Sequence, residues 1–131
     1  MPLPITTLYT AITIFMVVGL ALRVIGYRRL QRIALGDGGR EELQKRISAH
    51  SNLTENAPFF IIALGLLEWH GLGSIWLHGA GLTWLIARFL HPLGVERRYP
   101  KIPLRVISMG LTLTLHMSSS LLLLWFAWQS M

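Results

Sequence analysis

The sequence predicts an all-α membrane protein, an antiparallel bundle of four transmembrane helices. Its 131 residues are 53% hydrophobic and only 14% charged, whereas about a quarter of the residues in a typical soluble domain are charged. The stretches 1–22, 71–87 and 106–131 contain no charged residue. Because roughly 20 apolar residues cross a bilayer as a helix, these stretches predict membrane spans.

The positive charges predict the topology. All twelve Lys and Arg residues fall in two clusters, within residues 23–46 and 88–105. Cytoplasmic loops of membrane proteins are enriched in Lys and Arg, so we expect both clusters to face the cytoplasm and both termini to lie outside. Anionic lipid headgroups attract such clusters. We therefore expect membrane lipids as partners and no nucleic acid.

We expect a single domain over residues 1–131, and we take its helices in order. The first helix spans about residues 3–35 and is retained, because it lacks the basic start and the cleavage site of a signal peptide. Gly36–Gly39 end it, and Asp37 can cap the second helix. The second helix spans about residues 40–70.

The third helix spans about residues 74–93, after a tight turn at Gly71–Gly73. The fourth spans about residues 103–129, with Pro103 in its first turn, where the missing N–H costs nothing. Aromatic residues prefer the membrane boundary, and four tryptophans should mark the outer one: Trp69, Trp76, Trp125 and Trp128. With no cysteine in the chain, disulfides and thiol catalysis are excluded.

A polar stripe on the second helix is the most informative feature. Residues three or four apart share a helix face, and Lys45, Ser48, Asn52 and Glu55 follow that spacing. A carboxylate at the depth of Glu55 is costly in a membrane, so we expect it to point into the bundle or a polar cavity and to find a partner. Pro58 frees the carbonyl of Thr54 as a further acceptor.

The third and fourth helices offer matching groups. Arg88 and His91 are three residues apart on the third helix, and a second stripe runs along the fourth. That second stripe comprises Arg105, Ser108, Thr112 and Ser119. In an up-down bundle these groups meet at the cytoplasmic end. Guanidinium groups pair with carboxylates, so the expected ligand is small, zwitterionic and rich in carboxylate. A cation such as Arg105 can also stabilise a thiolate.

A purely structural interpretation stays open at this point. Arg88 and Arg105 lie where arginines extend towards headgroups, and Asn52 can join helices by hydrogen bonds. Glu55 can pair with either arginine. No helix carries histidines and carboxylates at metal-ligand spacing on one face, so we expect no metal site.

The motif "KRISAHSNLTENAPFF" resembles the MAPEG family (membrane-associated proteins in eicosanoid and glutathione metabolism). The segments "ARFLHPLG" and "PLRVISMG" support the resemblance, and "GDGG" followed by "EL" is similar to its small bacterial branch. The resemblance implies a homotrimer in a bacterial inner membrane. It also implies glutathione as co-substrate, bound between subunits at the basic end.

On this resemblance, the expected activity is a glutathione-dependent transferase or peroxidase for lipophilic electrophiles or hydroperoxides. Arg105 matches the family arginine that stabilises the thiolate, and the remaining site residues bind glutathione. Glu55 lies near its amine and Arg88 near a carboxylate; the full binding set is Lys45, Asn52, Glu55, Arg88 and His91.

The chain also departs from the family pattern. Ser48 stands where enzymatic members often carry Arg, Asn56 stands where Tyr is common, and His91 and Val95 replace two frequent tyrosines. A non-catalytic protein of the same fold that binds a lipid or small anion is therefore an alternative. A small multidrug exporter is a more remote one, because its essential carboxylate lies in the first helix, where this chain has none.

Overall fold

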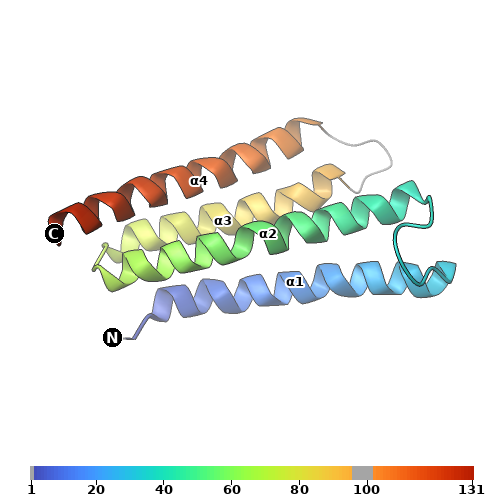
Figure 1. The fold of residues 1–131 in the computed structure, drawn as a ribbon, viewed down its shortest axis with the longest axis horizontal. Helices are drawn as coiled ribbons and strands as arrows, with labels where there is room; N and C mark the ends of the chain where they lie inside the picture. Colours follow the sequence, from blue (N-terminus) through green and yellow to red (C-terminus); the bar gives the residue numbers. More distant parts are fainter. Residues whose placement is uncertain (1, 96–101) are drawn as a thin grey trace.

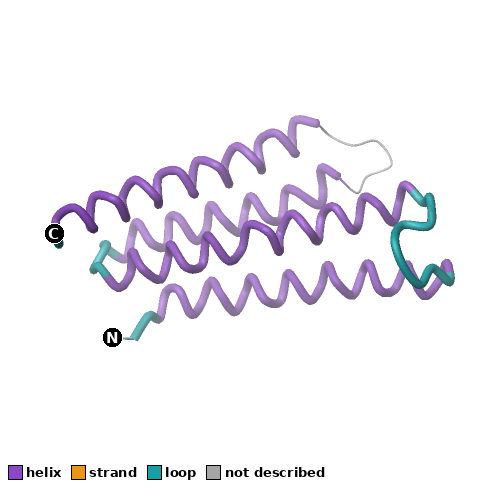
Figure 2. Tube along the Cα trace, viewed as in Figure 1, coloured by secondary structure: helices purple, strands orange, loops and turns teal. Residues whose placement is uncertain are grey.

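The computed structural model describes residues 2–95 and 102–131, which form four α-helices. They are α1 (Pro4–Gln31), α2 (Glu41–Trp69), α3 (Ser74–Val95) and α4 (Ile102–Gln129). The helices lie side by side and alternate in direction, so both termini lie at one end of the bundle (Figure 1). Figure 2 shows how short the described connections are. The second basic loop, with Arg97, Arg98 and Lys101, lies outside the described residues.

Two of the described helices are long and apolar enough to cross a membrane by length and composition. They are α1, with a hydropathy of 2.1, and α4, with 1.5. The other two have the length, with 29 residues in α2 and 22 in α3; α2 carries the first polar stripe, and α3 carries Arg88 and His91. The four tryptophans expected at the outer boundary are 51% to 80% exposed, and they lie towards the end of the bundle that holds both termini.

The first helix ends four residues earlier than the sequence predicts. Arg32 adopts a left-handed conformation with φ 53°, and the N–H of Ile33 donates to the Arg28 carbonyl at 3.0 Å. A left-handed residue after the last turn is a common helix terminus. The expectation that Asp37 caps α2 is wrong, because its carboxylate accepts the N–H of Gly39 at 3.0 Å and Arg40 occupies the cap position.

The start of α1 is capped from another helix. Leu3 at its N-cap provides no side-chain hydrogen bond. Instead the carboxylate of Glu68 on α2 accepts the N–H groups of Ile5 at 3.0 Å and Thr6 at 2.7 Å. An acidic group is favourable at a helix N-terminus because the exposed N–H groups there carry partial positive charge. Glu68 thereby ties α1 to the end of α2.

Trp84 lies at the centre of the core. It is fully buried and stacks on Phe60 of α2, with 4.5 Å between ring centroids. Its Nε1 donates to Thr13 of α1 at 3.1 Å, so one side chain of α3 joins three helices. One turn towards the end that holds both termini, Tyr9 packs so closely on Gly81 that a Cβ added there would clash with its ring.

Candidate functional site

A polar pocket opens where α2 and α4 begin and α3 ends, at the end of the bundle away from both termini (Figure 1). Its volume is about 470 Å³. Residues from α2, α3 and α4 line it, with α2 contributing most of them. The lining residues are Glu41, Gln44, Lys45, Ser48, Ser51, Asn52, Glu55, His91, Val95 and Arg105.

The whole predicted stripe of α2 lines the polar pocket. Lys45, Ser48, Asn52 and Glu55 succeed one another along one face because a helix turns about 100° per residue. The opposite face carries the apolar residues that pack in the bundle, such as Leu53 at 2% exposure. The stripe therefore lies on one continuous wall.

Lys45 already has an acidic partner in the polar pocket. Its Nζ lies 2.7 Å from Glu41 Oε1, one helical turn earlier. The hydrogen bond and positive charge of Lys45 hold the pKa of the exposed Glu41 carboxyl below its ordinary value. Such a pair on an exposed surface contributes little to stability, but it offsets the lysine charge that faces the pocket.

Glu55 borders the polar pocket but lacks the partner that we expected. The sequence predicts that it points into the bundle or a polar cavity and finds a partner; within the described part of one chain it lines the polar pocket, but its carboxylate is exposed and has no hydrogen-bonding or ionic partner. The reason is angular: Glu55 lies two residues from both Leu53 and Ala57, the buried positions on α2. Two residues correspond to about 200° on a helix, so Glu55 faces away from the bundle interior.

Arg105 enters the polar pocket from the first turn of α4. Its side chain is exposed and has no hydrogen-bond or ion-pair partner among residues 2–95 and 102–131. The end of α3 packs tightly beside it: a Cβ on Gly94 would lie 3.0 Å from both Arg105 Cγ and Arg105 N. Glycine thus allows α3 to approach α4 closely enough for Arg105 to face α2.

Arg88 lies behind the wall of the polar pocket. It is 2% exposed, its Nη1 donates to Asn52 Oδ1 at 2.6 Å, and its Nη2 donates to the Thr112 hydroxyl. The guanidinium also covers the Trp84 ring, 4.8 Å from its centroid. Because Arg88 is buried and already bonded, its placement favours positioning Asn52 over the direct ligand contact that we expected.

The second polar stripe faces inward and continues this network. Ser108 and Thr112 are fully buried. The Thr112 hydroxyl donates to the Ser108 carbonyl at 2.7 Å, and the Ser108 hydroxyl donates to the Arg105 carbonyl at 2.9 Å. A chain of hydrogen bonds therefore connects Arg88 to the backbone of Arg105. It links α3 to the turn of α4 that carries Arg105.

His91, one turn after Arg88 on α3, is the predicted site residue nearest the end of that helix. It lines the polar pocket at 7% exposure. Its Nδ1 is buried and has no hydrogen-bond partner within the described residues. A buried polar atom without a partner is costly, so His91 adds an unsatisfied group behind the pocket surface.

An apolar groove adjoins the polar pocket along α2 and α4. Its volume is about 600 Å³, and Glu55 borders both spaces. The groove continues towards the end of the bundle that holds both termini, between aliphatic and aromatic side chains, with His116 among them. Its lining residues are Glu55, Asn56, Phe59, Ile62, Ala63, Leu66, His116, Ser120 and Leu123. A polar and a lipophilic molecule can therefore meet at Glu55.

Comparison with known proteins decides the family. The model of the MAPEG family matches residues 6–126. The chain is also similar to the protein named inner membrane protein YecN in Escherichia coli strain K12, with 30% identity over 94 residues that cover 72% of each chain. The protein of that name in E. coli O6:H1 matches equally. The chain belongs to the MAPEG family.

This MAPEG protein brings five of the six predicted site residues to one pocket. Lys45, Asn52, Glu55, His91 and Arg105 line it, and the sixth, Arg88, holds one of them from behind. The sequence reasoning missed other lining residues, among them Gln44 and Ser51. Both lie one position before a residue of the stripe, on its edge, and helical spacing of the pocket wall could have included them.

Proposed function

We propose that this MAPEG protein is a glutathione-dependent membrane transferase or peroxidase that acts on lipophilic electrophiles or hydroperoxides. One observation carries the proposal. Within the described residues, Glu55 and Arg105 bring opposite charges to one pocket and neither has a partner there. A ligand with both an ammonium and carboxylate groups offsets both charges. Glutathione has these groups, and family membership favours it.

The residues divide between binding and chemistry. Glu55 binds the amine of glutathione, and Lys45, Asn52 and His91 complete the polar wall, with Arg88 holding Asn52 in place. Arg105 lies beside the thiol. A neighbouring cation lowers the pKa of a thiol and so raises the share of the nucleophilic thiolate, and it stabilises negative charge without rearrangement during the reaction.

The adjoining apolar groove binds the second, lipophilic substrate. In conjugation, the thiolate sulfur forms a bond to an electrophilic carbon, and the leaving group departs with its electron pair. In hydroperoxide reduction, two glutathione molecules supply two electrons, and the O–O bond breaks to give an alcohol and water with glutathione disulfide. Glu55 borders both spaces, so glutathione in the polar pocket lies next to a lipophilic molecule in the groove.

A homotrimer completes this site. Glu55 is exposed on a single chain, and apolar side chains beside it are exposed too, including Phe59 at 69% and Ile62 at 61%. A carboxylate on a membrane-facing surface is costly, so a neighbouring subunit should cover this face. We propose the inner membrane as the location, with basic loops in the cytoplasm; the printed name of YecN supports this membrane.

Arg105→Ala tests the proposal in a glutathione-conjugation assay with a general aryl halide on detergent-solubilised protein. Loss of one charge beside a thiolate shifts a pKa by about one to three units, so the rate at neutral pH should fall at least about tenfold. The pH at which the rate rises should move upward. Arg29→Ala removes an exposed arginine outside the polar pocket. It should change neither the rate at neutral pH nor the pH at which the rate rises. Equal rates in wild type and Arg105→Ala would rule out the assigned role.

The second candidate is a non-catalytic MAPEG protein that binds a lipid or a small anion. Ser48, Asn56 and Val95 favour it, because they remove donors that enzymatic members often carry at these positions. Isothermal titration without glutathione binding, on an intact oligomer, would support this candidate. The family match argues against the small multidrug exporter.

A further inference from the structure

A separate pocket lies between α3 and α4, towards the end of the bundle that holds both termini (Figure 1). We call it the α3–α4 pocket. Its volume is about 650 Å³, within the roughly 300–1,000 Å³ typical of ligand pockets. Two core residues, Leu67 and Leu77, line it and are 3% and 1% exposed, so the pocket reaches into the bundle.

One polar group of this pocket has no partner. Ser119 lines the pocket and is only 6% exposed. Its hydroxyl makes no hydrogen bond among residues 2–95 and 102–131, yet it is not one of the fully enclosed polar atoms, so a ligand in the pocket can reach it. The Leu115 carbonyl, one helical turn earlier, already accepts the Ser118 hydroxyl at 3.1 Å. A buried hydroxyl without a partner is costly, so an oxygen acceptor in the pocket is favourable.

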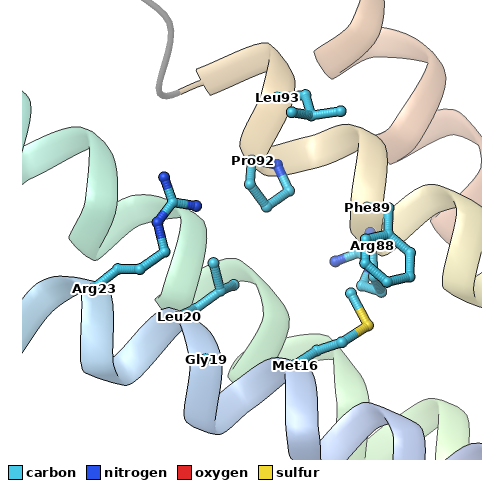
Figure 3. A pocket seen from close by; sticks show the side chains of 8 residues that line it. All are labelled: Met16, Gly19, Leu20, Arg23, Arg88, Phe89, Pro92 and Leu93. Atoms are coloured by element: carbon cyan, nitrogen blue, oxygen red, sulfur yellow. The ribbon is translucent and has the colours of Figure 1, made fainter.

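The pocket between α1 and α3 is smaller, and its charged groups are already engaged. Figure 3 shows its lining, which includes Arg23 and Arg88. Both arginines interact within the chain, and the pocket measures about 310 Å³, less than half the volume of the α3–α4 pocket. The α3–α4 pocket therefore combines more space with a hydroxyl that a ligand can reach.

The walls of the α3–α4 pocket favour a flat, uncharged molecule. Among the described residues that line it, none is charged. On α3, Gly79 and Ala80 leave part of the wall without long side chains, and a Cβ built on Gly79 would meet nothing within 4 Å. Trp76 adds an aromatic face, and aromatic rings attract one another when offset or edge to face. A planar ring can therefore lie against this wall.

The depth of Ser119 distinguishes between lipophilic ligands. Trp125 and Trp128, six and nine residues later on α4, are expected at the outer membrane boundary. At 1.5 Å per residue, Ser119 lies about 9–14 Å inside that boundary. The phosphate and ester oxygens of a phospholipid lie in the headgroup region, outside the hydrocarbon core. A ligand whose oxygen reaches Ser119 therefore carries it on an uncharged lipophilic part, such as a ring carbonyl.

We propose that the α3–α4 pocket binds a membrane quinone. One ring carbonyl accepts the hydrogen bond of the Ser119 hydroxyl, the ring lies against Gly79 and Ala80 beside Trp76, and the apolar tail extends into the lipid. An acyl chain alone cannot satisfy the hydroxyl. The pocket shares no lining residue with the polar pocket or the apolar groove, so it is distinct from the proposed glutathione site.

Retention of decylubiquinone by delipidated protein tests this site. The matched probes are decylbenzene, which has the same alkyl chain and a ring without oxygens, and phosphatidylcholine. After size-exclusion chromatography in detergent, mass spectrometry of an extract measures how much of each probe remains per chain. We expect wild type to retain decylubiquinone severalfold more than either of the other probes.

Two substitutions in the pocket should lower the retention of decylubiquinone. Gly79→Leu fills the open space beside α3 and should lower it severalfold. Ser119→Ala removes one neutral hydrogen bond, worth about a twofold to tenfold change in affinity, and should reduce the retention of decylubiquinone to that of decylbenzene. Gly19→Leu is the matched control, at a glycine with equally open surroundings in the pocket between α1 and α3, and should change nothing.

Four results would overturn the proposal. Equal retention of decylubiquinone and decylbenzene by wild type would show that no oxygen is recognised. A preference for phosphatidylcholine would identify a phospholipid site. Loss of decylubiquinone in Gly19→Leu and not in Gly79→Leu would place it between α1 and α3. Unchanged retention in Ser119→Ala would remove the assigned hydrogen bond, and this variant alone decides if Gly79→Leu lowers the thermal stability. Glutathione takes no part in this test, so the quinone site and the proposed function can fail separately.

Discussion

Lys45 and Arg105 both bring positive charge to the polar pocket, but only Lys45 has an acidic partner within the described part of the chain. That partner, Glu41, lies one helical turn away at 2.7 Å. An anionic ligand must therefore compete with Glu41 for Lys45, whereas it meets Arg105 without competition. Arg105 should dominate the binding of an anion, and Lys45 should contribute less than its charge suggests.

Glu41→Gln should release Lys45 and raise the affinity for glutathione by a few-fold, because the competing carboxylate is lost. The lowered pKa of Glu41 keeps the pair ionised above that pKa, and the pair is lost only as the pH falls through it. At neutral pH the change in affinity therefore results from the substitution and not from protonation of Glu41. Isothermal titration measures the affinity for glutathione. Glu42→Gln is the matched control, since Glu42 pairs with Arg46 outside the pocket; an equal gain there would contradict the account.

Helical spacing was enough to predict the stripe on α2 and the inward face of the second stripe. Helical spacing could not predict which polar side chains have hydrogen-bond or ion-pair partners. Arg88 looked like a ligand group because its sequence position places it beside the pocket, but contacts with Thr112 and Trp84 bury it. Such contacts depend on how three helices pack. Glu55 was expected to point into the bundle or a polar cavity and to find a partner. It borders the polar pocket, and its exposure depends on the angle between its position and the buried face of α2.

At the scale of elements, α3 carries two glycines with opposite surroundings. A Cβ on Gly81 would lie 2.3 Å from the Tyr9 ring, whereas a Cβ on Gly79 would meet nothing within 4 Å. Tyr9 cannot move away easily, because it is 3% exposed and its hydroxyl donates to the His78 carbonyl at 3.2 Å. The small residue at position 81 therefore sets the distance between α1 and α3 at this level.

Gly81→Ala should destabilise the protein by about 1–3 kcal/mol, the usual cost of an extra carbon in a packed core. Gly79→Ala should be neutral or stabilise by up to about 1 kcal/mol, because alanine favours the helix. Unfolding in a denaturing detergent measures both free energies. The packing described for α1 and α3 would be wrong if the two variants unfolded alike.

Hydropathy and glycine positions were enough to predict the four helices, but not the residues at which they end. The first helix ends at Gln31 because the backbone of Arg32 is in the left-handed conformation. Arginine rarely adopts this conformation, and no sequence pattern predicts it here. The cap that Glu68 provides for α1 joins residues more than 60 positions apart. Capping rules consider residues that are close together in the sequence, so they could not predict this contact.

At the scale of the molecule, the charge clusters predict that the polar pocket lies at the cytoplasmic end and that both termini lie outside. The chain has no cysteine, so single cysteines can report this topology without background. A membrane-impermeant thiol reagent added to intact cells should label Ser130→Cys, near the C-terminus, and not Asp37→Cys, in the loop between α1 and α2. Both should react after the membrane is opened. The reverse pattern in intact cells would invert the topology.

The central claim is that Glu55 and Arg105 together bind the opposite charges of glutathione. Isothermal titration of glutathione into wild type, Glu55→Gln and Arg105→Ala tests it most directly. Wild type should bind saturably. Each variant should lose roughly tenfold to a hundredfold in affinity, as expected for a lost charged hydrogen bond. Equal affinity in all three proteins, or no binding to any of them, would contradict the account.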